Sequence, residues 1–296
     1  MSTSARLRLI VRLARPSDLV LAALTYALGA GAARYLGNDL RPLSLWVGLV
    51  WVLLLLFATH LLAACFQPAD EPFLESESRR ERARLRLMML QLAVAALSVS
   101  AALTVLMLRD GRLTPPVLFF QALALILGLA YAIPPLRMKD RGFGELALAI
   151  LLADFFPAIA FFLQAEEFHR LLAMVTTPLT ALALAFFLAT DFPSFATDLK
   201  YERHTMLTRL GWQRAIPLHH LLLVVAYLLF ALAPLLAFPW SLLWPAFLTV
   251  PLAAYQVFML RNIALGAKPV WRLLLLNGAA IFGLTAYSLT LTLWLR

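Results

Sequence analysis

Residues 43–64 read LSLWVGLVWVLLLLFATHLLAA, a run of apolar residues without a charged side chain. A helix of roughly 20 such residues crosses the hydrocarbon core of a bilayer, because in lipid every backbone N–H and C=O must be paired within the segment. Similar runs follow one another along the whole chain. They lie at approximately 17–36, 43–64, 87–108, 114–133, 143–163, 171–190, 215–237, 240–259 and 273–294. We therefore predict an all-α integral membrane protein with nine transmembrane helices.

The composition excludes a soluble protein. Apolar residues make up 62% of the 296 residues and charged residues 14%, against about 45–50% and about 25% in soluble domains. Because the apolar runs extend from one end of the chain to the other, a soluble enzyme with a single membrane anchor is excluded as well. The single cysteine, Cys65, excludes an intrachain disulfide framework and a cysteine-rich metal site. Residues 1–296 are predicted to form one transmembrane domain.

The net charge of +9 is distributed in the way that membrane topology requires. Lysines and arginines lie between the apolar runs and form no stripe, which argues against a nucleic-acid partner. The N-terminal tail and the loops after the second, fourth, sixth and eighth runs carry 19 of them, and the opposite side carries six. Because cytoplasmic loops retain basic residues, we predict a multi-pass protein of the inner (plasma) membrane with a cytoplasmic N-terminus and an external C-terminus. No signal-type apolar core precedes the first run, so no cleavage is expected.

Two of the predicted cytoplasmic loops are long, residues 65–86 and 191–214. The first places a group of acids before five arginines, a pattern that a solvated linker also shows. In the second, Asp191, Asp198 and Glu202 are spaced by seven and four, so one continuous helix would present all three on one face. Such a face is either a ligand set for a divalent cation or a solvated surface.

A third segment, YAIPPLRMKDRGFGEL at residues 131–146, combines a Pro-Pro helix stop with three cations. Arg137, Lys139 and Arg141 would lie at the cytoplasmic rim of the bundle. Cations in that position suit a phosphorylated ligand, because charge-assisted hydrogen bonds to phosphate are strong. The segment therefore predicts an anion-binding site at the membrane surface.

Residues 131–145 closely resemble the Tyr-x-x-Pro-Pro-x-Arg-x-x-x-Arg-Gly-x-Gly-Glu stretch of UbiA-superfamily prenyltransferases, and most of all the 1,4-dihydroxy-2-naphthoate branch. Residues 192–211, FPSFATDLKYERHTMLTRLG, look like that branch's Phe-Pro-Asp-Tyr-Glu-x-Asp followed by Arg-Thr-Leu-x-x-Arg-Leu-Gly. Arg15-Pro16 also fits the opening Arg-Pro of the family. With nine spans and long loops after the second and sixth, the resemblance covers nearly the whole chain.

The resemblance implies a helical bundle around a central cavity, where an isoprenyl diphosphate is ionised and its allylic carbocation alkylates an aromatic acceptor. It also implies that Mg²⁺ bridges the diphosphate to acids of both long loops while basic residues take up leaving-group charge. Taking the resemblance together with the spacing and charge arguments above, we predict Asp198, Asp191 and Glu71 for catalysis. For substrate binding we predict Arg137, Lys139, Arg141, Tyr131, Lys200 and Arg203. For the metal we predict Asp198, Glu202, Asp70 and Glu71.

The sequence departs from the family at its acidic motifs. The first, Asn-Asp-x-x-Asp-x-x-x-Asp, falls on residues 63–71, where Ala63, Ala64 and Gln67 replace three polar or acidic residues and Glu71 stays acidic. In the second motif the first Asp falls on Ser194 and the Glu on Ala196, which leaves Asp198, and the usual Gly-Lys pair is Glu202-Arg203. Asp198 and Glu71 could supply the minimum for a metal, and the candidate replacements, offset from the family positions, are Asp191, Glu202, Asp70 and Glu75.

Asp154 lies in the middle of an apolar run, where a bare carboxylate is costly, so we predict either a substrate-binding role or a polar partner inside the bundle. His60, one turn before the first acidic motif, either lines the cavity or packs between helices. Two functions follow from these residues. The first is transfer of an isoprenyl group to a small aromatic or quinone-precursor acceptor. The alternative is a non-catalytic relative that binds a lipid diphosphate or a quinone, or that supports a partner enzyme.

Overall fold

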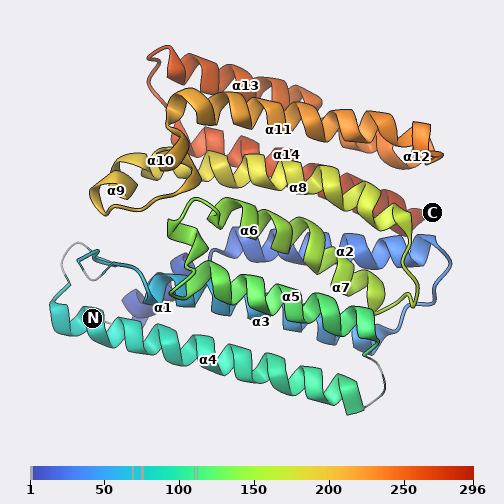
Figure 1. Cartoon of the computed structure of the whole chain (residues 1–296), viewed down its shortest axis with the longest axis horizontal. Helices are drawn as coiled ribbons and strands as arrows, with labels where there is room; N and C mark the ends of the chain where they lie inside the picture. Colours follow the sequence, from blue (N-terminus) through green and yellow to red (C-terminus); the bar gives the residue numbers. More distant parts are fainter. Residues whose placement is uncertain (1–2, 69, 75–76, 110, 112) are drawn as a thin grey trace.

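The computed structural model describes residues 3–68, 70–74, 77–109, 111 and 113–296, and within these ranges the chain forms helices and no strands (Figure 1). The helices of the first half are α1 (Thr3–Leu13), α2 (Pro16–Tyr35), α3 (Pro42–Cys65), α4 (Arg79–Arg109), α5 (Pro115–Ala132), η1 (Met138–Asp140), α6 (Gly144–Ile150), η2 (Leu151–Phe155) and α7 (Phe156–Phe162). Those of the second half are α8 (Arg170–Asp191), η3 (Phe192–Ser194), α9 (Phe195–Lys200), α10 (Met206–Leu210), α11 (Trp212–Leu232), η4 (Ala233–Leu236), α12 (Trp240–Leu243), η5 (Trp244–Thr249), α13 (Val250–Ala264) and α14 (Trp271–Leu295).

Eight helical segments of the described chain are long and apolar enough to cross a membrane, so the protein is a multi-pass membrane protein. They correspond to the second through ninth predicted spans. The first predicted span, residues 17–36, forms the 20-residue helix α2, which is not among the eight. The prediction is therefore confirmed for eight spans, and the count of nine is not.

One span carries a local irregularity with a clear cause. Residues 144–162 form α6, the π-helical turn η2 and α7 without interruption. Pro157 has no N–H to donate to the carbonyl four residues earlier, so the regular hydrogen-bond ladder is broken at this point, and the π-helical turn lies directly before it. This turn contains Asp154.

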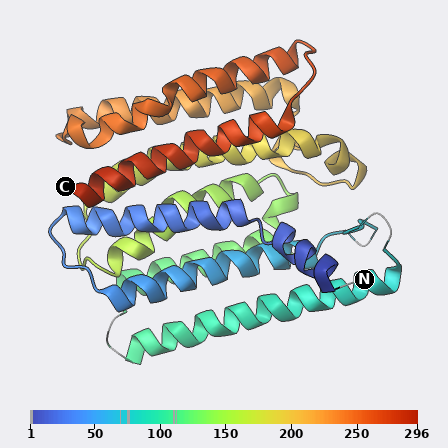
Figure 2. The same cartoon turned by 180° about the vertical axis from the view of Figure 1, so that it is seen from behind.

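The long helices pack side by side, with α4 at one edge of the bundle and α13 near the other (Figures 1 and 2). Helix α3 packs on α4, α11 packs on α8, and α2 lies between α14 and α7. The contact between α2 and α7 is close because Gly29 faces the backbone of Pro157, where a Cβ would lie 2.0 Å from the carbonyl oxygen. Small residues at such crossings let membrane helices approach closely.

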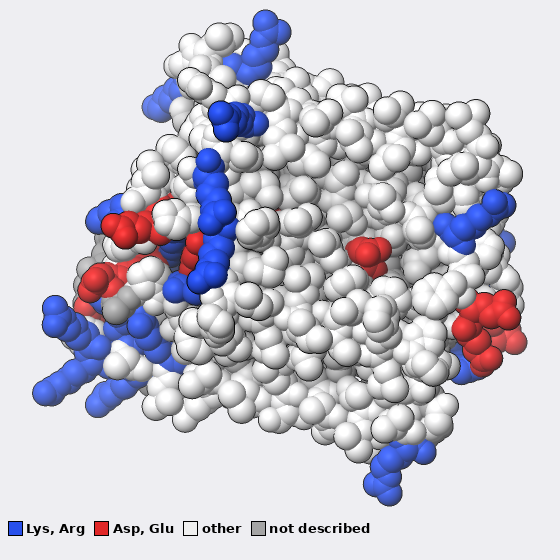
Figure 3. All heavy atoms as spheres, in the orientation of Figure 1, with Lys and Arg blue, Asp and Glu red and all other residues white. Residues whose placement is uncertain are grey.

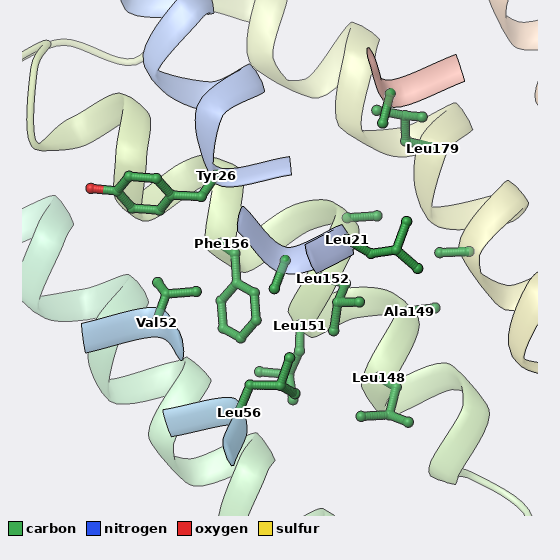
Figure 4. Close-up of a cluster of buried hydrophobic side chains, with 14 of the residues drawn as sticks. Leu21, Tyr26, Val52, Leu56, Leu148, Ala149, Leu151, Leu152, Phe156 and Leu179 are labelled. Carbon is green, nitrogen blue, oxygen red and sulfur yellow. The ribbon is translucent and has the colours of Figure 1, made fainter. Parts of the chain in front are cut away.

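The middle of the bundle is filled by side chains. Figure 4 shows buried side chains from α2, α3, α6, η2, α7 and α8 gathered in one cluster, with Phe156 near its centre. The side chains of Leu56, Leu151 and Phe156 are fully buried. Trp294 adds a polar link by donating from Nε1 to the Ala27 carbonyl at 2.9 Å, which joins α14 to α2. The space for a ligand lies nearer one end than the resemblance suggested.

The polar elements gather at that end, which we call the loop end: α1, residues 66–68, 70–74 and 77–78 between α3 and α4, η1, α9 and α10 (Figures 1 and 2). The C-terminus lies at the opposite end. On the face drawn in Figure 3 the charged side chains lie toward the two ends, and the broad middle is uncharged except for one acidic group. The prediction that the two long loops share one side of the bundle is thus confirmed.

Candidate functional site

A cavity of about 290 Å³ opens among the helix termini of the loop end. Its wall combines four cations with four acids and an apolar inner surface. The lining residues are Arg12, Leu13, Arg15, His60, Ala63, Ala64, Gln67, Tyr131, Lys139, Asp140, Gly144, Glu145, Leu148, Phe187, Thr190, Asp191, Ser194, Asp198, Arg203 and Thr205. The site therefore offers both a charged region and an apolar region to one ligand.

The turn between α1 and α2 positions the first cation. Arg15 adopts a left-handed backbone conformation (φ 50°) immediately before the proline that opens α2. Its Nε lies 3.3 Å from Oδ2 of Asp18, one turn into α2. The same carboxylate oxygen lies 3.4 Å from Nε2 of His60 on α3. Asp18 and His60 are both buried, so the N-terminal segment is joined to the cavity wall by a buried charged cluster.

A second cation joins the two long loops. The guanidinium of Arg203 donates from Nη1 to Oδ1 of Asp198 at 3.1 Å and from Nη2 to Oε1 of Glu71. Burial alone would lower the pKa of Arg203, but these two carboxylates raise it above its usual value, so the side chain is a permanent cation. Ser194 donates its hydroxyl to the other oxygen of Asp198 at 2.7 Å. Both oxygens of Asp198 are therefore engaged within the protein.

The third cation, Lys139, lies on the short helix η1. Gly144 allows this position, because a Cβ there would lie 2.7 Å from the Cα of Lys139. The segment that carries Arg203 is tied to η1 by a hydrogen bond from the His204 N–H to the Asp140 carbonyl at 3.3 Å. Burial and the neighbouring cation Arg203 lower the pKa of Lys139 to about 8. This lysine is thus the cavity cation whose charge changes near neutral pH.

Two carboxyl groups meet where α6 begins and α8 ends. Glu145 accepts a hydrogen bond from the Met206 N–H at 3.1 Å through Oε1. Its Oε2 is buried and, within the described part of the chain, has no hydrogen-bond donor, and the same holds for Oδ2 of Asp191. The side chains of Glu145 and Asp191 lie against each other. Such a pair requires either a shared proton or a cation, because two adjacent carboxylates repel.

The structure brings five of the predicted site residues together in the cavity wall: Tyr131, Lys139, Asp191, Asp198 and Arg203. Glu71 joins them indirectly, through Arg203. The remaining predicted residues do not line this cavity. Arg137 is held by Asp140 at 2.5 Å, Lys200 lies exposed over the ring of Tyr201, Arg141, Glu202 and Asp70 are exposed, and Asp154 is half-buried in the π-turn. Glu75 lies outside the described residues.

The predicted common face of Asp191, Asp198 and Glu202 does not form, because the helix does not run unbroken. Helix α8 ends at Asp191, a 3-10 turn follows, and α9 ends at Lys200. Glu202 then has a φ of 52°, which turns the chain out of helical geometry. Asp191 and Asp198 still face one cavity, whereas Glu202 points to the exterior.

The sequence reasoning missed several lining residues. Arg12 and Arg15 line the cavity, although the sequence analysis predicts no site role for these basic residues of the N-terminal segment. Glu145, the last residue of the motif at 131–145, lines it as well, and no role is predicted for it from the sequence. Its place in the first turn of a helix, directly after a glycine, was the signal that could have identified it.

The residues present do not fit a metal centre that bridges both long loops. The lining residues at the end of α3 and just beyond it are His60, Ala63, Ala64 and Gln67, and none of them supplies a carboxylate. Glu71 and Asp198, which occupy the other family positions, are engaged by Arg203. The described residues contain no group of three or more His, Cys, Asp or Glu side chains that could hold a metal ion. Because magnesium needs at least one or two free carboxylates, only the pair formed by Glu145 and Asp191 is left for it.

Several solved structures share this fold. A UbiA homologue from Archaeoglobus fulgidus bound to GPP and Mg²⁺ matches with a TM-score of 0.62 and 18% identity over 95% of this chain and 99% of that chain. The apo form of a UbiA homologue from Aeropyrum pernix K1 matches with a TM-score of 0.55 and 16% identity over 92% and 94%. A digeranylgeranylglyceryl phosphate synthase matches with a TM-score of 0.57 and 12% identity over 98% of both chains. No curated protein matches the sequence.

Together these features define an integral membrane protein that holds a charged site at one end of an apolar helical bundle. The sequence places it more narrowly. The model of the UbiA prenyltransferase family matches residues 78–275, well over half of the chain. The chain belongs to the UbiA prenyltransferase family.

Proposed function

We propose that this protein transfers an isoprenyl group from a prenyl diphosphate to a small aromatic acceptor, such as a quinone precursor, within the membrane. The observation that carries the proposal is the wall of the cavity, where Arg15, Lys139 and Arg203 converge beside an apolar surface. A prenyl diphosphate has the matching form, with a charged head and an apolar tail. The A. fulgidus homologue of the same fold was solved with GPP, which supports the same ligand class here.

The reaction follows from the charges in the wall. The allylic C–O bond breaks, both of its electrons leave with the diphosphate, and the fixed cations stabilise the charge that develops on the leaving oxygens. Arg203 and Arg15 carry permanent charges, and Lys139 adds a third when it is protonated. Because these groups are held by ion pairs and short turns, they need little reorganisation when the bond breaks.

The acceptor completes the substitution. A ring carbon forms the new C–C bond to the allylic carbocation, and the ring then loses its proton to restore aromaticity. His60 lines the cavity, and its imidazole in the neutral form can accept that proton. Asp18, whose carboxylate lies 3.4 Å from Nε2, orients the imidazole and stabilises its protonated form. Phe187 and Leu148 form the apolar part of the wall, where the tail and the ring are shielded from water.

The basic asymmetry of the loops supports an orientation in the inner (plasma) membrane with the loop end in the cytoplasm. In that orientation a prenyl diphosphate enters with its head in the aqueous phase and its tail in the bilayer. Magnesium, where a family member binds it, supplies positive charge to the diphosphate. Among the acids that line the cavity, Glu145 and Asp191 are the two that no arginine engages, and they would be the place for it.

Purified protein, incubated with radiolabelled geranyl diphosphate and a panel of aromatic acids, tests the proposal directly. We expect a prenylated product in the parent, and a roughly tenfold or larger loss of geranyl diphosphate affinity in Arg15→Gln, because a charge-assisted contact contributes about 1.5–3 kcal/mol. Arg209→Gln is the matched control, since Arg209 is exposed and does not line the cavity. A parent protein that neither binds geranyl diphosphate nor forms product refutes the proposal.

The second candidate is a non-catalytic member of the family that binds a lipid diphosphate or a quinone. The specific observation in its favour is the α3 wall, where Ala63, Ala64 and Gln67 stand at positions that carry polar and acidic residues in the family pattern. The same experiment separates the two functions. Binding of geranyl diphosphate without product, across the acceptor panel and with magnesium present, favours the non-catalytic one.

A further inference from the structure

The acids that remain at the family's metal positions do not face an empty space. Glu71, in the connection between α3 and α4, and Asp198, on α9, bind the same guanidinium. Arg203 thus links two loops that lie 132 residues apart in sequence. In the relatives that the sequence resembles, this linkage of the two loops is the role of Mg²⁺ together with the diphosphate. Here a side chain provides it without a ligand.

Arg203 also has a donor left for an anion. A guanidinium has five N–H groups in a planar fork, and two of its nitrogens are engaged by the carboxylates. Its Nε is buried and, within the described residues, has no hydrogen-bond partner. Nη1 and Nη2 each carry a second N–H besides the one given to a carboxylate. Because Arg203 belongs to the cavity wall, these N–H groups are the donors available to a phosphate oxygen.

The cavity wall at the end of α3 also lacks the carboxylates of the family's metal motif. A divalent cation between the two loops would require carboxylates on α3, but Ala63 and Ala64 offer only methyl groups. Gln67 is engaged as a donor, from Nε2 to the Glu71 carbonyl at 3.3 Å. With the α3 ligands replaced and the remaining two acids already neutralised, a cation placed there would gain little and would have to displace Arg203.

We propose that Arg203 takes the place of the divalent cation between the two loops, so that this protein binds the diphosphate of its substrate without magnesium. The guanidinium neutralises Glu71 and Asp198, holds the loops together and donates its remaining N–H groups to the diphosphate. The inference rests on the proposed function for the class of ligand, a prenyl diphosphate. It extends that function by stating which group performs the neutralisation.

Isothermal titration calorimetry of the detergent-solubilised full-length protein tests the inference, with geranyl diphosphate and inorganic pyrophosphate as probes. Each titration is performed once with excess EDTA and once with excess MgCl₂. In the parent we expect the two affinities for geranyl diphosphate to agree within about threefold, because by the usual conversion that is less than one charge-assisted hydrogen bond. Pyrophosphate, which lacks the tail, should bind more weakly with the same insensitivity to magnesium.

Arg203→Gln gives the decisive comparison. Without the guanidinium, affinity in EDTA should fall about tenfold or more, and Glu71 and Asp198 become free to bind a cation. Magnesium should therefore restore part of the affinity in Arg203→Gln although it has no effect on the parent. A variant that merely failed to fold would show no such restoration. Arg209→Gln is the matched control, because Arg209 is an exposed arginine of α10 that lies over Phe143 and does not line the cavity.

The failure of this inference differs from failure of the proposed function. If the parent binds geranyl diphosphate only with magnesium, Arg203 does not replace the metal, and the prenyl diphosphate assignment stands. If magnesium raises the affinity of the parent by tenfold or more and Glu145→Gln removes that increment, the cation binds at the pair formed by Glu145 and Asp191, and the inference is again overturned. If the parent binds neither probe under either condition, the proposed function itself fails.

Discussion

Lys139 should make ligand binding depend on pH in a range where phosphate groups no longer titrate. Its pKa is about 8, because burial and the adjacent cations Arg203 and Arg15 disfavour its charged form while Asp140 and Glu71 favour it. A bound diphosphate favours the charged form strongly. The free protein must therefore take up a proton at Lys139 when it binds the ligand above pH 8.

The magnitude follows from this pKa. At pH 7 roughly nine tenths of Lys139 is protonated, and at pH 9 roughly one tenth, by the ordinary titration relation for a pKa of about 8. If the bound diphosphate returns the pKa toward its usual value of 10.5, the affinity for the ligand falls by up to tenfold for each pH unit above 8. Since the last phosphate proton leaves near pH 6, the loss belongs to the protein.

Calorimetry with geranyl diphosphate at pH 7, 8, 9 and 10 measures this dependence, and buffers of different ionisation enthalpy report the proton uptake directly. Lys139→Arg should keep high affinity at every pH, because a guanidinium stays charged, and should abolish the proton uptake above pH 8. Lys200→Gln, which removes an exposed lysine nearby, should keep the parent profile. A parent profile that survives unchanged in Lys139→Arg would refute the reasoning, because another group would then titrate.

Two further substitutions test the helix packing and the acceptor half of the reaction. Gly29→Ala should lower thermal stability in detergent, by an amount on the order of 1–3 kcal/mol, because the new Cβ would meet the Pro157 carbonyl oxygen at 2.0 Å. Gly283→Ala, where a single leucine methyl lies at 3.2 Å, should cost much less. His60→Gln should lower the turnover rate by 10²-fold or more and leave geranyl diphosphate affinity unchanged. His219→Gln, at a buried histidine outside the cavity, should leave both unchanged, and equal turnover in His60→Gln would remove the proton-acceptor role.

Most of the fold was predictable because hydrocarbon imposes one requirement on every span. The exception is instructive. Helix α2 packs between α14 and α7, and from Ala27 to Ala33 every residue except Leu28 is alanine or glycine, which permits close approach. Small residues contribute less hydropathy than leucine or phenylalanine, and Asp18 in its first turn lowers the total further. The small residues that let α2 pack tightly against its neighbours also lower its hydropathy, so α2 is not among the eight candidate spans.

The site was less predictable, because sequence spacing does not report which way a turn directs its side chains. Arg137, Lys139 and Arg141 alternate along the chain and were predicted to act together. The 3-10 turn at Met138–Asp140 separates them. It places Lys139 in the cavity wall, pairs Arg137 with Asp140, and leaves Arg141 exposed.

The substitutions at the two acidic motifs can be understood as one change. A carboxylate buried without a partner is costly, and so is a buried cation without a counter-ion. With aspartates on both loops, an arginine at position 203 could not neutralise them all, and a metal would be required. With alanine at 63 and 64, the two acids that are left match the two ends of one guanidinium. The absence of carboxylates on α3 and the presence of Arg203 are therefore expected to depend on each other. The substitution Ala64→Asp alone should destabilise the site unless magnesium is supplied.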